Sequence, residues 1–501
     1  MKIEQAINQL IAYGYDTGLL DPLDQDYAIN RLRNLLGVKD FVFEEVDVRH
    51  KAIHEILMPF IDYALEKGMI TETIDERDNF DTQVMDCITP PPSHVIGEFG
   101  WEIEHNGVKD ATDYFYDFNK ASNYIRVDRI EKDKKWAVET PYGQMEMTIN
   151  LSKPEKDPRT IALAQTMVSS SYPKCLLCKE HVGNNGSLTT PPRNNHRVIP
   201  LTLNNEEWVF QYSPYVYYNE HCIVIRDAHI PMKISRETFV RLLEFVQDFR
   251  HYFIGSNAGL PIVGGSILDH EHYQGGRHIF AMDKAEVIKS FTLNKGREIS
   301  VDVLKWPLTT LRLRRVYEEA EDLLAMVNAA THVLEVWRGH SDPACEIHAF
   351  TGDTPHNTIT PIARYNKETN ELELDITLRN NRTSEAHPDG IFHPHAHLHH
   401  LKKENIGLIE VMGLAVLPGR LVQELEEVKT ALLRGDHKNL GKHGAWVQEL
   451  LSEYPTITET NVQSIIETAI GQKFTEILEC CGVYKQTSTG LAGLDRLIQK
   501  L

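Results

Sequence analysis

One short stretch, residues 270–274 (HEHYQ), constrains the fold more than any other part of this chain. Side chains at positions i, i+2 and i+4 of a β-strand lie on one face. A strand here would place two imidazoles and one amide in a row, a set of groups suited to hold and attack a phosphorus centre. Two histidines on a strand are more often a solvated face, so the neighbouring sequence has to decide. Glycines and polar side chains lie just upstream, where the backbone can approach a ligand closely: Asn257, Gly264, Gly265 and Ser266.

The composition is that of a folded globular protein. The 501 residues are enough for two to four domains, and 42% are hydrophobic and 25% charged. The formal net charge of −20 argues against a broad nucleic-acid-binding surface. An anionic substrate would therefore be bound by local donors. No run of about 18 apolar residues occurs, so we expect no membrane span.

Cysteine usage indicates a reducing compartment. The chain has seven cysteines, and only Cys175/Cys178 and Cys480/Cys481 are closely spaced. An odd number in a chain of this size favours reduced thiols and metal ligands over a disulfide framework. The first residues predict an amphipathic helix rather than a signal peptide. We therefore expect a cytoplasmic protein.

The pattern along the chain predicts helical ends and a mixed middle. Residues 1–90 are expected to be mostly helical, and the prolines at 90–92 are expected to end that region. Short alternating stretches follow up to residue 150. Between 160 and 300, strands should surround one helix that begins near Ser235, a plausible N-cap. Downstream we expect a hairpin at 358–380, a strand at 408–416, a helix at 420–434 and helices in the last 60 residues.

A second constellation could bind a metal. Cys175 and Cys178 form a CxxC before a Gly/Asn-rich loop, and two thiolates at this spacing can chelate one zinc. The pair could equally be a redox pair or two buried thiols. His229 follows a short β-branched strand, where a surface position is the simplest interpretation. The alternative interpretation is that His229 is the third metal ligand and His270 the fourth, which would complete a tetrahedral structural site.

The order of these motifs resembles that of the histidine-triad superfamily. Within it, the chain resembles the second, bacterial class of galactose-1-phosphate uridylyltransferases. The resemblance extends over essentially the whole chain and is most specific at 170–280 and 390–420. It implies that His272 is the nucleophile that attacks the α-phosphorus of a UDP-sugar, and that Gln274 donates to a phosphoryl oxygen. Glu271 and Tyr273 depart from the first-class motif, which has proline and glycine there, and this leaves the charge around His272 unexplained.

The resemblance also implies substrate and metal ligands. Loop residues Ser266 and Asn257, with Gly264 and Gly265, would contact the phosphates, and Phe210 is the best match for the base-binding strand, with core packing as the alternative. The implied zinc ligands are Cys175, Cys178, His229 and His270. A second metal such as iron is implied at His395 and His397, with Glu286 and His387 as further candidates. Lys402, Lys403 and Glu410 would reach sugar and phosphate, or else form a solvated rim.

The resemblance implies an α+β (α/β) fold with two histidine-triad-like domains, mostly antiparallel sheets flanked by helices, and a largely helical N-terminal region. The expected divisions are 1–150, 151–300, 301–440 and 441–501. The implied activity is transfer of UMP from UDP-glucose to galactose 1-phosphate, giving UDP-galactose and glucose 1-phosphate by a ping-pong mechanism. The implied assembly is a homodimer. The alternatives are a dinucleotide or sugar-nucleotide phosphorylase of the same superfamily and a non-enzymatic zinc-containing binding protein.

Overall fold

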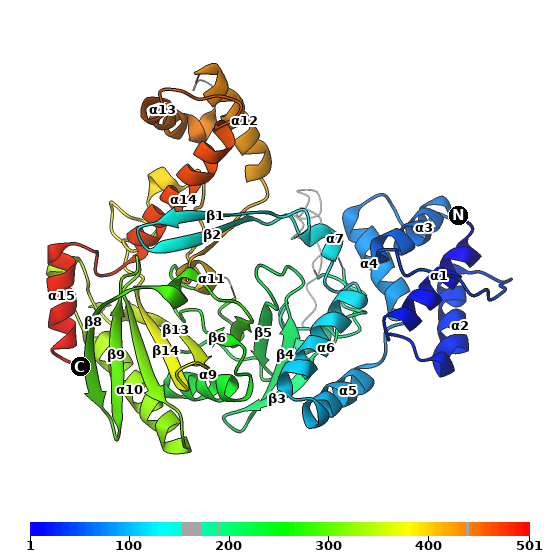
Figure 1. Cartoon of the computed structure of the whole chain (residues 1–501), viewed down its shortest axis with the longest axis horizontal. Coiled ribbons are helices and arrows are strands. Elements are labelled where there is room, and N and C mark those ends of the chain that lie inside the picture. Colours follow the sequence, from blue (N-terminus) through cyan, green and yellow to red (C-terminus); the bar gives the residue numbers. More distant parts are fainter. Residues whose placement is uncertain (153–171, 188–189, 266, 437–439) are drawn as a thin grey trace.

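The computed structural model describes residues 1–152, 172–187, 190–265, 267–436 and 440–501. Its N-terminal part is a group of helices (Figure 1). They are α1 (Ile3–Asp16), α2 (Gln25–Leu36), α3 (Ile53–Glu66), α4 (Ile74–Asp86), α5 (Pro92–His105), α6 (Val108–Ala121) and α7 (Val127–Ile130). The expected helical start is confirmed, but the prolines do not end the region. Pro92 begins α5 instead, because the first helical position needs no N–H and suits the fixed φ of proline.

The centre of the molecule is a ten-stranded sheet in which every neighbouring pair is antiparallel. In spatial order its strands are β3 (Ile199–Leu203), β4 (Glu206–Tyr212), β5 (Cys222–Arg226), β7 (His272–Gly276), β6 (Phe253–Gly255), β13 (Asn357–Asn366), β14 (Glu371–Asn380), β10 (Thr310–Val316), β9 (Glu298–Leu304) and β8 (Val287–Asn294). The hairpin expected at 358–380 is β13 and β14. The α+β class with mostly antiparallel sheets is confirmed.

Two long helices cover one face of this sheet. The helix α9 (Arg236–Asp248) follows Ser235, as expected, and packs on β3, β6 and β13. The helix α10 (Ala320–Gly339) packs on β9, β10, β13 and β14. Figure 1 shows both helices on the same side of the sheet. The strands β6 and β13 pair where the two expected histidine-triad-like halves meet, so one sheet runs through both. The division into domains stays a prediction.

The opposite face is covered by segments from both ends of the chain. A small sheet joins β1 (Lys134–Thr140), β2 (Gly143–Ile149) and β15 (Leu414–Leu417), and β15 runs parallel to β2. The strand expected at 408–416 is wrong in its first half, which is the short helix α11 (Leu408–Val411). Asn257 and Glu410 accept the N–H groups of Leu408 and Gly407, and these bonds hold the turn as a helix start. The remaining helices are α12 (Leu421–Arg434), α13 (Gly444–Glu453), α14 (Val462–Cys481) and α15 (Ser488–Ile498), with a small hairpin β11 (Phe350–Thr351) and β12 (Thr354–Pro355).

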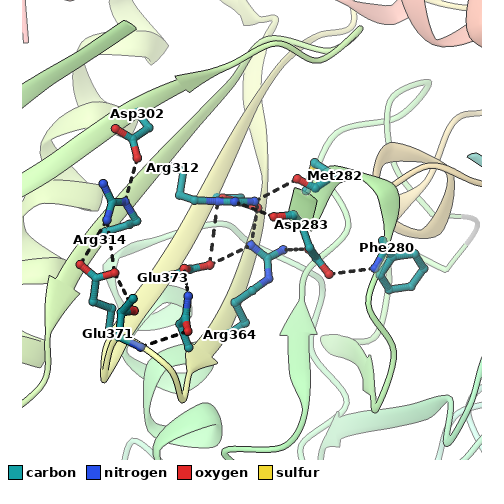
Figure 2. A network of polar contacts seen from close by, with 12 residues as sticks. Phe280, Met282, Asp283, Asp302, Arg312, Arg314, Arg364, Glu371 and Glu373 are labelled. Atoms are coloured by element: carbon teal, nitrogen blue, oxygen red, sulfur yellow. Dashed lines mark hydrogen bonds and ion pairs between the residues drawn. The ribbon is translucent and has the colours of Figure 1, made fainter. Parts of the chain in front are cut away.

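Buried charges replace apolar packing on this face of β10, β13 and β14. Asp375 accepts from Arg312 at 2.7 Å and from Arg364 at 2.7 Å. Arg364 also pairs with Asp283, in the turn that precedes β8, and Figure 2 shows how this network joins that turn to the sheet. Arg312 binds both oxygens of Asp375, and such bidentate pairing offsets part of the cost of desolvating the charges. The network thus fixes a covering segment to the second half of the sheet.

Across the described residues, no helix is both long and apolar enough to cross a membrane.

Candidate active site and metal centre

The strand that carries the HEHYQ stretch is β7, and it begins at His272 rather than at His270. In the antiparallel register, His272 lies opposite Ile225 and Gln274 lies opposite Ile223. Directly opposed residues share a face, so the side chains of His272 and Gln274 lie on the sheet face away from Tyr273. We call this the site face. On the neighbouring strand β6, Gly255 pairs with Gln274. Asn257 follows two residues later, and its side chain accepts the N–H of Leu408 in the same region.

The imidazole of His272 is held in one orientation. Its Nδ1 lies 2.8 Å from the carbonyl oxygen of His270, so Nδ1 is assigned as the donor and Nε2 keeps its lone pair. The residue is 6% exposed, and burial lowers the pKa of His272 below the usual value. A neutral imidazole with an available Nε2 is the form that a nucleophile needs.

The four predicted metal ligands come together in space. Cys175 Sγ lies 3.6 Å from Cys178 Sγ and 3.2 Å from His270 Nδ1. Cys178 Sγ lies 3.4 Å from His229 Nδ1 and 3.8 Å from His270 Nδ1. A tetrahedral zinc with ordinary bond lengths separates two sulfurs by about 3.8 Å and a sulfur and a nitrogen by about 3.6 Å. Both the donor set and the spacing therefore fit a closed zinc site.

The outer partners of the two histidines support the same geometry. His270 Nε2 lies 2.7 Å from the carbonyl oxygen of Arg226, which leaves Nδ1 facing the two sulfurs. His229 Nε2 lies 3.7 Å from Asp269 Oδ2. Histidines that bind metals usually donate their second N–H to a carbonyl or a carboxylate. The backbone from 269 to 272 thus connects the metal centre to His272.

Glu271, which the sequence left unexplained, points away from the site face. It is buried and pairs with Arg226 at 2.8 Å and with Arg241 at 3.0 Å. Both arginines also bind Glu206, at 2.6 and 2.7 Å. Tyr273 Oη donates to Glu271 at 3.3 Å. This four-charge network fixes the backbone between His270 and His272 from the side opposite the site face.

Several predicted substrate contacts are also brought together. Asn257 lies against Gly265, where an added Cβ would come within 2.9 Å of its amide nitrogen. Lys402 and Glu410 are buried and pair at 2.8 Å, which excludes the solvated-rim alternative for these two residues. Gly264 is packed against Ala258 and has no room for a side chain. Ser266 lies outside the described residues, and Lys403 is exposed.

The placement of Phe210 contradicts the prediction of a base contact. Phe210 lies opposite Val224, and Val224 lies opposite Tyr273, so Phe210 is on the face away from His272. It is fully buried and packs against Phe115 and Phe249 at ring-centroid distances of 5.9 Å. The alternative of core packing is correct for this residue. On β4, the side chains of the site face are Val209 and Gln211 instead.

The second predicted metal site gains no support. The rings of His395 and His397 lie 6.5 Å apart, His395 bonds the carbonyl oxygen of Ile391, and His397 pairs with Glu476. His387 stacks on His395, whereas Glu286 pairs with Lys305 in a separate place. Within the described ranges, Cys175, Cys178, His229 and His270 form the single group of three or more such ligands with metal-binding spacing. A second metal remains a prediction.

Sequence reasoning missed two features of the site. The arginine pair behind Glu271 gave little signal, because Arg226 ends an apolar strand and Arg241 lies on the helix α9. His221 immediately precedes the same strand and shares the site face, but a single histidine beside a strand gives little signal.

Comparisons with known proteins identify the family. The family model for the N-terminal domain of galactose-1-phosphate uridyl transferase matches residues 18–231, and the model for the C-terminal domain matches residues 244–448. A galactose-1-phosphate uridylyltransferase of Clostridium acetobutylicum is 48% identical over 100% of both chains. One of Halalkalibacterium halodurans is 50% identical over 99% of this chain and 98% of the relative.

Among solved structures, a yeast Ap4A phosphorylase aligns with 13% identity and a TM-score of 0.31, over 67% of this chain and 89% of that one. This score is too low to carry an argument. The full-length matches to the uridylyltransferases, together with the HEHYQ strand and its Cys/His centre, show that the chain belongs to the galactose-1-phosphate uridylyltransferase family.

Proposed function

We propose that the chain transfers UMP from UDP-glucose to galactose 1-phosphate, giving glucose 1-phosphate and UDP-galactose. The observation that carries the proposal is the buried, neutral His272, whose Nδ1 is held by the His270 carbonyl, in a chain 48% identical over its full length to a galactose-1-phosphate uridylyltransferase. The substrates are sugar nucleotides and hexose 1-phosphates.

The reaction proceeds in two displacements at one phosphorus. In the first, the Nε2 lone pair of His272 bonds to the α-phosphorus of UDP-glucose, and the bond to the bridging oxygen breaks, so that glucose 1-phosphate leaves with the electron pair. In the second, a phosphate oxygen of galactose 1-phosphate attacks the same phosphorus, and the P–N bond breaks. His272 returns to its neutral form. Splitting the transfer this way gives ping-pong kinetics.

The neighbouring groups have supporting roles. The amide of Gln274, on the same face as His272, donates to a phosphoryl oxygen as charge develops there. Asn257, Gly264 and Gly265 lie in the segment that we propose receives the phosphates. Lys402 contributes a buried cation that Glu410 neutralises, so this pair positions substrate rather than adding net charge.

We propose that zinc binds at Cys175, Cys178, His229 and His270, whose donor atoms and spacing fit it. With four protein ligands, the metal would brace the backbone beside His272 and leave no open position for substrate. We also propose a homodimer, on the family resemblance, and a cytoplasmic location, which fits seven free cysteines in the described chain.

Steady-state kinetics with purified enzyme test the activity. Release of glucose 1-phosphate in multiple turnovers should require galactose 1-phosphate, and double-reciprocal plots should be parallel. Turnover with inorganic phosphate in place of the sugar phosphate, or with a dinucleotide substrate, would instead identify a phosphorylase and overturn the proposal.

A further inference from the structure

His221 is a buried histidine on the site face that the reaction above does not use. It immediately precedes β5, and its carbonyl oxygen accepts the N–H of Ser213 at 2.7 Å, which extends the β4–β5 ladder by one pair. Because side chains alternate along an extended chain, His221 shares the face of Ile223, two residues on. Ile223 lies opposite Gln274, so His221 and Gln274 are neighbours on one face.

The imidazole of His221 is buried without satisfied hydrogen bonds. The residue is 2% exposed, and within the described chain neither Nδ1 nor Nε2 has a hydrogen-bond partner of good geometry. The rings of Tyr217 and Tyr218 lie 5.3 and 4.6 Å away, and the amide of Gln274 faces it. Buried polar side chains are nearly always hydrogen-bonded, so this pair of nitrogens calls for a partner.

The groups around His221 are suited to a hydroxyl rather than to an anion. Burial lowers the pKa of His221 to about 3, so the ring is neutral at working pH. Burial raises the pKa of Tyr217, with smaller contributions from Tyr215, Glu410 and Asp133, so this phenol stays neutral. The nearby cation, Lys402, is already paired with Glu410. A neutral imidazole, an amide, a phenol and a carboxylate are groups that exchange hydrogen bonds with sugar hydroxyls.

We propose that His221 contacts the substrate and hydrogen-bonds one hydroxyl of the hexose, beside the phosphoryl group that Gln274 receives. This inference rests on the proposed function and names a residue that selects the hexose. A site built to hydrogen-bond a hydroxyl rejects an analogue that lacks it, since the protein group then loses its partner. His221 would therefore discriminate between hexose 1-phosphates that differ at one position.

The test compares wild type with His221→Phe and His221→Gln on galactose 1-phosphate and on its 2-, 3-, 4- and 6-deoxy analogues. We expect kcat/KM with galactose 1-phosphate to fall by about tenfold or more in His221→Phe, the size of one lost neutral hydrogen bond. One deoxy analogue should be about tenfold worse than galactose 1-phosphate for wild type but equal to it for His221→Phe. His221→Gln, which keeps a donor and an acceptor, should recover part of the discrimination.

A merely structural role would lower kcat/KM for all acceptors by the same factor and leave the ratios between them unchanged. His251→Leu is the control, because His251 is a partly buried histidine whose pKa burial also lowers, but it bonds Thr112 away from the site. Unchanged ratios in both His221 variants, with uridylylation of His272 intact, would overturn this inference alone. Failure of wild type to form any uridylyl adduct would overturn the proposed function and this inference with it.

Discussion

The network behind Glu271 makes a quantitative prediction about stability. Glu271 and Glu206 together balance Arg226 and Arg241, so the four side chains carry no net charge. Replacing Glu271 with glutamine leaves two guanidinium groups with one carboxylate. The side chains of Glu271 and Arg241 are each 4% exposed, so little solvent is available to stabilise the extra positive charge.

Removing one partner from a buried ion pair costs about 3–5 kcal/mol. Arg226 and Glu206 have side chains that are 19% and 29% exposed, so some charge is solvated, and we expect the lower end, about 3 kcal/mol for Glu271→Gln. The matched control is Glu206→Gln, which removes the more exposed carboxylate from the same two arginines. We expect about 1 kcal/mol there, the value of a well-solvated pair.

Urea-unfolding midpoints, converted with the wild-type slope, measure both free energies of unfolding. The double variant Glu271→Leu with Arg241→Met should recover much of the loss, because it removes a charge of each sign and fills the space with apolar atoms. Equal costs for Glu271→Gln and Glu206→Gln, or a cost below about 1 kcal/mol for Glu271→Gln, would refute the view that burial of this charge fixes the backbone between the two histidines.

Three further predictions concern the packing of Phe210, the Cys/His cluster and two histidines of low pKa. Phe210→Ala should lower the free energy of unfolding by about 3–5 kcal/mol but leave the KM for UDP-glucose within about twofold of the wild-type value. A rise in this KM without loss of stability would instead support a contact between Phe210 and the base. Metal analysis of purified Cys175→Ser should show clear loss of zinc from about one per chain in wild type, with Cys345→Ser as the unaffected control. Burial lowers the pKa of His221 to about 3 and of His251 to about 4, so the unfolded chain takes up protons at these sites below about pH 6.5. The free energy of unfolding should therefore fall as pH drops from 6.5 towards 4, and this fall should be smaller in His221→Gln. An equal fall in His221→Gln and wild type would contradict the low pKa of His221.

Local sequence was sufficient for the Cys175/Cys178 pair and for the face that His272 and Gln274 share. The two cysteines are close in sequence, whereas His229 lies 51 residues from Cys178 and His270 lies 95 residues from Cys175. The expected alternation holds at 272–274, where the strand begins. The start of α11 was not predictable, because an apolar run fits a strand as well as a helix. The bond from Leu408 to Asn257, which is 151 residues away in sequence, helps to decide between them.

The role of Phe210 depended on information of the same long-range kind. Along β4, Trp208, Phe210 and Tyr212 alternate with Glu207, Val209 and Gln211, so the sequence shows two different faces but not which of them meets substrate. The register of β4 against β5, and of β5 against β7, decides it. The pairing of β6 with β13, which makes one sheet of the two expected halves, likewise arises from contacts more than 100 residues apart.

The central claim is that His272 carries the uridylyl group, and the position of the adduct tests it most directly. The enzyme is incubated with UDP-glucose labelled in the uracil, without acceptor, and peptides are then mapped by mass spectrometry under alkaline conditions that preserve P–N bonds. We expect an acid-labile label on His272, released as UDP-galactose when galactose 1-phosphate is added, and no label on His272→Asn. Label on another residue, or full turnover by His272→Asn, would contradict it.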